Sequence, residues 1–162
     1  MQDSISLNLT QNDVPTTSDD YYTPPWVFES LGLTFDTDPA SPVGGIPWIP
    51  VKRYYSLIDD GLRQEWVGRV WLNPPFSKPS PWVEKFIQHG NGILLAPTSG
   101  NGKWLNDIFN EATAILLLPP SIKFMRNKTN LMVNAIPIRC ALFAMGEENA
   151  EALRKTGFGK VR

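Results

Sequence analysis

Apolar and polar residues follow one another in short blocks along most of the chain, and these blocks predict strands that alternate with helices. Apolar runs or apolar–polar alternation predict strands at 33–38, 68–73, 92–97, 114–118 and 138–144. Apolar residues at helical spacing, or capping signals, predict helices at 23–32, 80–88, 103–111 and 147–155. The run 92–97 is almost wholly apolar, which is typical of a strand covered on both faces.

Residues at the ends of two predicted helices support their placement. Thr23 is a predicted N-cap, Pro24 and Pro25 suit a first helical turn, and Gly32 suits a helix exit. Ser80 is a predicted cap for the second helix. We expect three segments to lack regular structure: an irregular stretch, a turn and a loop, at 46–58, 59–62 and 127–134.

The alternation of strands and helices predicts an α/β fold with an open, mostly parallel central sheet. Residues 1–18 are polar without periodicity and are expected to form a flexible arm, and residues 19–162 a single domain. Ligands of such sheets bind at the carboxyl ends of the strands. Asp38 and Asn73 both end predicted strands, so they are the first candidate site residues.

Composition narrows the function classes. The chain has 162 residues, with 15 Lys and Arg against 16 Asp and Glu, so nonspecific attraction to phosphates is not its main mode of action. Cys140 is the only cysteine, and we expect a buried, inert thiol rather than a disulfide or a metal ligand. No basic and apolar leader and no long apolar run is present, so we expect a cytosolic protein.

The segment Asn73-Pro74-Pro75-Phe76 resembles motif IV of the amino-methyltransferases. An exocyclic amine on adenine is a poor nucleophile, because its lone pair is delocalised into the ring. The Asn73 oxygen and the Pro74 carbonyl can accept both amino hydrogens and direct the lone pair at a methyl donor. Prolines fix the backbone, and the Phe76 ring can stack on a flipped base.

Three further segments resemble cofactor-binding motifs of the same enzymes. Each of the four segments taken alone also fits a plain structural role, as a turn or a helix start. The further segments resemble motif X (Tyr22, Thr23, Pro24), a shortened motif I (Asp38, Pro39, Ala40) and motif III (Asp59 or Asp60, of which we favour Asp60).

The order and spacing of these segments over residues 19–146 resemble the phage-type DNA N-6-adenine methyltransferases, the phage Dam family. The resemblance implies a class I, Rossmann-like methyltransferase fold and S-adenosylmethionine as the donor, with S-adenosylhomocysteine as product and no metal. It further implies adenine N6 in DNA as the target and a phage or prophage gene acting inside a bacterial cell.

Basic side chains suggest a face for the DNA phosphates, although they also fit ordinary surface charge. The residues expected to contact DNA are Phe76, Lys123, Arg126, Lys128 and Arg139, with Lys155, Lys160 and Arg162 as further cations. Ser121-Ile122-Lys123-Phe124 stands where the family tends to have Gly-Arg-Ile-Lys-Phe. Sequence choice is expected to come from the loops 41–55 and 120–137, because no separate recognition domain is present.

Two alternatives keep parts of this hypothesis. The same chemistry could act on RNA or on a protein glutamine, since those enzymes use similar tetrapeptides. A degenerate member could bind nucleic acid or cofactor without turnover, because the usual glycine-rich turn after Asp38 is replaced by Pro39-Ala40-Ser41. The intact tetrapeptide at Asn73 argues against degeneration.

Overall fold

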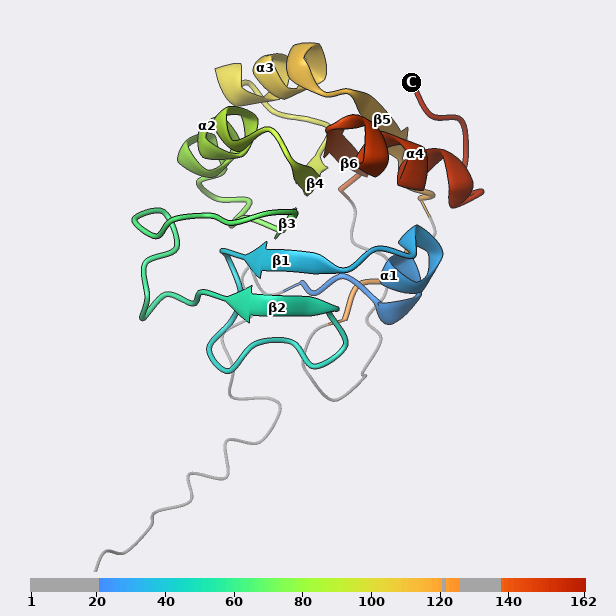
Figure 1. Cartoon of the computed structure of the whole chain (residues 1–162). Helices are drawn as coiled ribbons and strands as arrows, with labels where there is room; N and C mark the ends of the chain where they lie inside the picture. Colours follow the sequence, from blue (N-terminus) through green and yellow to red (C-terminus); the bar gives the residue numbers. More distant parts are fainter. Residues whose placement is uncertain (1–20, 121, 126–137) are drawn as a thin grey trace, which may run out of the picture.

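The structure is a computed structural model that describes residues 21–120, 122–125 and 138–162 (Figure 1). The predicted arm 1–18, the predicted loop 127–134 and the candidate DNA contacts Arg126 and Lys128 lie outside the described residues. The helices of the structure are α1 (Pro25–Leu31), α2 (Ser80–His89), α3 (Lys103–Glu111) and α4 (Glu147–Lys155). Within the described residues, no helix combines the length and apolar character needed to cross a bilayer.

A six-stranded sheet forms the centre of the fold, with the spatial order β2-β1-β3-β4-β6-β5. Its strands are β1 (Phe35–Asp38), β2 (Val51–Tyr54), β3 (Val70–Leu72), β4 (Gly92–Pro97), β5 (Ala114–Leu117) and β6 (Cys140–Met145). β2, β1, β3 and β4 pair in parallel, whereas β6 runs antiparallel to both β4 and β5. The predicted α/β class with a mostly parallel sheet is therefore confirmed.

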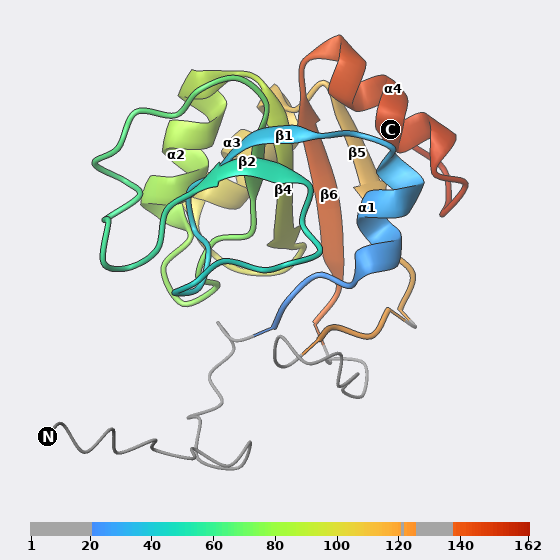
Figure 2. The same ribbon diagram turned by 60° about the horizontal axis from the view of Figure 1, so that its bottom comes forward.

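Helices cover both faces of the sheet, and each face has its own apolar cluster (Figure 2). Val27, Phe28 and Leu31 of α1 pack with Leu153 of α4 on one face. On the other face, side chains of α2 and α3 pack against the strands, namely Val83, Phe86, Trp104 and Ile108. β4 is buried along its whole length, because it lies in the middle of the sheet between these layers.

Three predicted details of the chain are wrong. Ser80 is not the N-cap of α2, because Pro79 holds that position and Ser80 is the first helical residue. Residues 46–58 are not wholly irregular, because β2 forms within them. β2 is an edge strand with three exposed residues, so its sequence lacks the apolar alternation that reveals a half-buried strand. Thr23 is not the N-cap of α1, since Pro24 holds that position and the Thr23 side chain is buried without a hydrogen bond in the described part of the chain.

The single cysteine behaves as predicted. Cys140 begins β6 and is 1% exposed. Burial raises the pKa of its thiol to about 12, so almost no thiolate forms near neutral pH. The expectation of a buried, free thiol is confirmed, and the raised pKa is what an inert thiol requires.

A buried polar network ties α4 to the amino ends of β3 and β4. Asn149 is 1% exposed, and its side-chain oxygen accepts a hydrogen bond of 2.7 Å from Nε of Arg69. Its amide nitrogen donates to Oδ1 of Asn91 at 2.8 Å and to the Met145 carbonyl at 2.7 Å. Loss of the Asn149 side chain would break all three hydrogen bonds at once. Asn149 therefore contributes more to the attachment of α4 to the sheet than a single surface hydrogen bond would.

We expect Asn149→Leu to lower the free energy of unfolding by about 2–3 kcal/mol, because the leucine leaves buried donors and acceptors unpaired. Urea denaturation followed by tryptophan fluorescence measures this change. Asn110→Leu on the exposed side of α3 is the matched control and should stay within about 0.5 kcal/mol. A loss below about 1 kcal/mol for Asn149→Leu would contradict the assigned role.

Candidate functional site

The carboxyl ends of β1 and β3 meet at the point where the strand order of the sheet reverses. From β1, the next strand β2 lies on one side, and the following strand β3 lies on the other. Crevices at such switch points are where open α/β sheets bind ligands. Asp38 is the last residue of β1 and Asn73 follows the last residue of β3, so the predicted pair lies on neighbouring strands at one edge.

Asn73 points toward the segment that precedes α1. Trp71 packs on the α1 side of the sheet, while Leu72 packs on the α2 side, so alternation places Asn73 on the α1 side. Its Nδ2 donates to the Tyr21 carbonyl at 3.2 Å. Its Oδ1 accepts no hydrogen bond from the described part of the chain, so one acceptor remains for a ligand.

The two prolines and the phenylalanine after Asn73 are enclosed to different degrees. Pro74 is buried and Pro75 is half-buried. Phe76 is also half-buried and packs against the apolar cluster on the α1 side. One side of the Phe76 ring therefore packs on the apolar cluster, and the rest of the ring is accessible at the carboxyl edge.

The predicted motif X segment lies beside this loop. Tyr22 and Met125 exchange two backbone hydrogen bonds, of 2.7 and 2.8 Å. The Trp48 indole nitrogen donates to the Thr23 carbonyl at 2.8 Å. With the bond from Asn73 to Tyr21, these contacts hold residues 21–23 against the catalytic-loop candidate.

Asp38 is a buried carboxyl group without a cation. Its side chain accepts a hydrogen bond of 3.3 Å from the Ala40 amide, and within the described residues it has no ion pair. Burial raises its pKa to about 7, although the Ala40 amide acts in the opposite direction. A carboxylate is costly to bury alone, so this position favours a positively charged ligand group.

Two hydroxyl groups close to this edge are also unsatisfied. The Thr23 and Ser41 hydroxyls are buried and have no hydrogen-bond partner in the described part of the chain. Buried polar groups nearly always have a hydrogen-bond partner, so we expect a ligand or a water to bind each of these hydroxyls. Sequence reasoning missed Ser41, although it follows directly after the segment Asp38-Pro39-Ala40.

The turn after β2 separates the roles of its two aspartates. The Asp59 carboxylate is used inside the turn, where it accepts hydrogen bonds of 2.9 and 3.2 Å from the amide and hydroxyl of Ser56. Asp60 has a left-handed backbone (φ 55°), and its exposed carboxylate lies 3.3 Å from Nε of Arg63. Asp60 is thus the carboxylate that faces outward.

Gly61 brings this turn onto the end of β1. A Cβ atom at Gly61 would collide with the Pro39 carbonyl oxygen, so only glycine permits the contact. The candidate motif III segment therefore touches the candidate motif I segment at Pro39, and Tyr21, next to the candidate motif X segment, touches Asn73. The structure brings all four predicted segments together at the carboxyl edge.

Sequence reasoning also missed a clamp that holds this turn to α2. The Trp66 indole nitrogen donates to the Gly61 carbonyl at 2.8 Å. The Lys85 ammonium donates to the Leu62 and Gln64 carbonyls at 2.8 and 2.5 Å and lies 4.9 Å from the centre of the Trp66 ring. Desolvation lowers the pKa of Lys85. The five-residue spacing of Gly61 and Trp66 could have indicated the bond between these two residues, whereas no local pattern indicates the contacts of Lys85.

The candidate DNA-binding cations within the described residues lie at two different edges. Lys123 is exposed, between the buried residues Ile122 and Phe124 that follow β5. Arg139 is exposed just before β6, at the carboxyl end of β4. Arg162 instead pairs through its backbone with Ile115 at the start of β5, which is the opposite edge.

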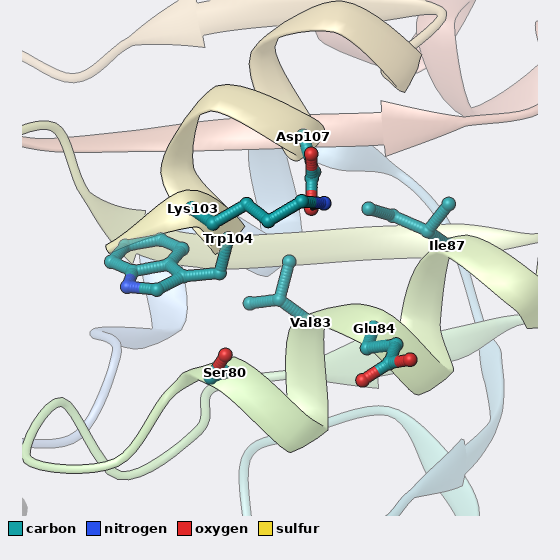
Figure 3. A pocket seen from close by; sticks show the side chains of 7 residues that line it. All are labelled: Ser80, Val83, Glu84, Ile87, Lys103, Trp104 and Asp107. Atoms are coloured by element: carbon teal, nitrogen blue, oxygen red, sulfur yellow. Dashed lines mark hydrogen bonds and ion pairs between the residues drawn. The ribbon is translucent and has the colours of Figure 1, made fainter. Parts of the chain in front are cut away.

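A cleft of about 240 Å³ lies elsewhere, between α2 and α3 (Figure 3). Its walls include Ser80, Val83 and Glu84 from α2. Lys103 and Asp107 of α3 form an ion pair of 2.6 Å across one helical turn beside it. None of the predicted site residues lines this cleft. Separately, the described residues contain no group of three or more His, Cys, Asp or Glu side chains that could hold a metal ion.

The sequence of the chain is similar to those of known DNA methyltransferases. A sequence model of the family DNA N-6-adenine-methyltransferase (Dam) matches residues 11–154. The chain is 27% identical over 133 residues to the DNA N-6-adenine-methyltransferase of Haemophilus phage HP1 (strain HP1c1), a match that covers 75% of each chain.

A second relative matches a smaller part of the chain. The chain is 32% identical over 71 residues to the DNA N-6-adenine-methyltransferase of Escherichia phage T1, which covers 40% of this chain and 30% of that protein. No solved structure matches the chain. Since the family model spans most of the sequence, the resemblance found in the motifs is confirmed, and the chain belongs to the DNA N-6-adenine-methyltransferase (Dam) family.

Proposed function

We propose that the protein methylates adenine N6 in DNA with S-adenosylmethionine as the donor, on a class I methyltransferase fold. The convergence of the four motif segments at one sheet edge carries this proposal, because it joins a candidate amine-binding loop to a candidate donor site. The strand order, with one antiparallel strand between β4 and β5 in an otherwise parallel sheet, supports the fold class. The phage relatives, whose names state this activity, support the substrate.

The unsatisfied groups near β1 fit S-adenosylmethionine. When bound, this donor supplies a methyl group on a sulfonium, next to a methionine end that carries an α-ammonium. The buried, unpaired Asp38 suits that ammonium, and the Thr23 and Ser41 hydroxyls offer further polar contacts. The residues that would hold the donor are Tyr22, Thr23, Pro24, Asp38, Pro39, Ala40, Asp60 and Asn73.

Asn73 would bind the target amine. Its Nδ2 is engaged by Tyr21, which orients the amide and leaves Oδ1 as the acceptor for one amino hydrogen. The Pro74 carbonyl is the proposed acceptor for the other hydrogen, and Pro74 and Pro75 fix its direction. Holding both hydrogens directs the nitrogen lone pair away from the loop, and correct placement supplies much of the catalysis.

The target adenine must leave the base stack to reach this loop. Phe76, half-buried at its base, offers a ring face on which the flipped base can stack. Lys123 and Arg139, exposed at the same edge, would contact phosphates, and Arg126 and Lys128 are proposed for the same role.

We expect Asn73→Ala to abolish formation of N6-methyladenine, with a rate loss of about a hundredfold or more, since a positioned acceptor is removed. The protein is incubated with labelled S-adenosylmethionine and DNA, RNA or protein, and the digested products are identified by mass. Donor binding, followed by calorimetry, should weaken by a smaller factor than turnover, because the other proposed donor-binding residues are unchanged. Asn106→Ala, on an exposed position of α3, is the matched control and should retain activity.

The products decide between the alternatives. N6-methyladenine from wild type but not from Asn73→Ala supports the proposal. Methylated RNA or methylated glutamine alone would assign a different substrate. If wild type binds the donor but forms no product, the proposal that the protein is a catalyst is wrong.

We also expect a pH effect from Asp38. Because its pKa is raised to about 7 in the folded state, the native protein holds this proton more tightly than the unfolded chain, and the free energy of unfolding falls as pH rises through this range. Between pH 5 and 8 the loss is about 2–3 kcal/mol. Asp38→Asn removes this contribution, so urea denaturation should find the variant gaining stability relative to wild type over the same interval.

Donor binding completes this test. Asp38→Asn should bind S-adenosylmethionine at least roughly tenfold more weakly, because a charged partner for the ammonium is lost. Equal affinity of the two proteins would place the donor elsewhere. Parallel stability curves for wild type and variant across pH would contradict the buried, unpaired carboxyl group.

A further inference from the structure

Two large aliphatic side chains in the turn after β2 are almost fully exposed. Leu57 is 89% exposed and Ile58 is 79% exposed, more than the other exposed large apolar residues of the described chain. A single exposed leucine needs no explanation. Two adjacent ones at the tip of an ordered turn beside a candidate active site indicate a surface that binds something.

The turn that carries them is firmly closed at its base. Ser56 is 7% exposed, and its amide and hydroxyl are held by the Asp59 carboxylate. Its carbonyl accepts hydrogen bonds of 3.0 and 3.2 Å from the amides of Asp59 and Asp60. A closed base means that little conformational entropy is lost when the tip is ordered by a partner.

The tip emerges next to the donor site. Before the tip, the backbone amide of Tyr55 donates to the Asp38 carbonyl at 2.8 Å. The Tyr55 carbonyl accepts a hydrogen bond of 2.9 Å from the Ser41 amide. After the tip, Gly61 rests on Pro39. The tip and Asn73 follow the ends of β2 and β3, which flank β1, so the axes of these two strands lie about 10 Å apart. That is less than the width of a DNA major groove, about 12 Å, so one duplex can contact both.

The charges around the tip suit a polyanion. Arg53 is exposed and makes no ion pair within the described residues. The Asp59 carboxylate is consumed inside the turn, and Asp60 is paired with Arg63. The tip itself is apolar, so it suits the interior of a base stack rather than the phosphates.

We propose that Leu57 and Ile58 form an apolar wedge that enters the base stack of the duplex beside the target adenine. This inference rests on the proposed function, because it requires DNA as the substrate. A flipped base leaves a gap in the stack, and proteins often fill or open base steps with leucine or isoleucine. The wedge lowers the cost of the flip while Asn73 and Phe76 receive the base.

The exposure of the pair argues against two other occupants. A side chain that lines the donor site would be enclosed by that site, whereas Leu57 contacts almost nothing. A second copy of the chain would need a broad apolar face, yet the neighbouring strand β2 presents the charged residues Lys52 and Arg53.

The test compares wild type with the double variant Leu57→Ser/Ile58→Ser. On a fully paired duplex, kcat/KM for methylation should fall roughly tenfold or more, because unstacking loses its support. On the same duplex with an abasic site opposite the target adenine, the variant should recover to within about threefold of wild type, because less pairing must be broken. 2-Aminopurine at the target position should brighten with wild type and stay dim with the variant.

Phe109→Ser is the matched control. Phe109 is 44% exposed on α3, away from the proposed site residues, so its loss should change neither substrate's kcat/KM. Affinity for S-adenosylmethionine, measured by calorimetry, should be the same for wild type, the double variant and the control. Circular dichroism and the urea midpoint establish that each variant is folded.

Several results would overturn the wedge. Equal activity of wild type and the double variant on the paired duplex would exclude it. An equal loss on paired and abasic duplexes would assign the pair to general DNA contact, and weaker donor binding would assign it to the donor site. Loss of a wild-type dimer in sedimentation would assign it to self-association. If wild type forms no N6-methyladenine at all, the proposed function fails as well.

Discussion

The parallel pairing of β1 with β3 is the constraint on which the candidate site depends. It sets the carboxyl ends of two neighbouring strands at one edge, where the chain leaves β1 toward β2 and leaves β3 toward α2. Because the two exits diverge, no element of the sheet closes the space between them. Asp38 and Asn73 are the polar residues at these two ends, so the strand pairing brings a buried carboxyl group and an amide group to one edge of the sheet although they are far apart in the chain.

The site keeps unfavourable groups that the rest of the fold must offset. Among the described residues, Asp38 is buried without a cation and two hydroxyls have no hydrogen-bond partner, and Asp60 has a left-handed backbone. Such features persist only where the surroundings fix them. The clamp of Trp66 and Lys85 holds the turn of Asp60, and the bridge between Tyr22 and Met125 holds the segment beside Asn73. These contacts fix the backbone of the site while its polar side chains stay available.

The sequence was sufficient for elements with a strong pattern and for the grouping of the motifs. The segments 92–97, 103–111 and 147–155 have the predicted bounds, because burial on both faces or clear helix-end residues defined them. β2 was missed because an edge strand with Lys52 and Arg53 has no apolar period to detect. The clamp was missed for another reason: Lys85 meets Leu62 only after α2 folds back onto the sheet, and no local pattern encodes that contact. The unpaired state of Ser41 likewise depends on packing around it rather than on its neighbours in sequence.

Net charge and site geometry together constrain how this domain can engage DNA. With 15 basic and 16 acidic residues, the whole molecule offers little long-range attraction to phosphates. At the amino edge, Arg69 and Lys52 are paired with Glu148 and Asp36, so those cations are already compensated. Affinity must then come from a small number of uncompensated groups at the carboxyl edge and from contacts that salt does not screen. An apolar tip beside the switch point supplies contacts of that kind, and it acts only on a duplex that has already been brought to the edge where Asn73 lies.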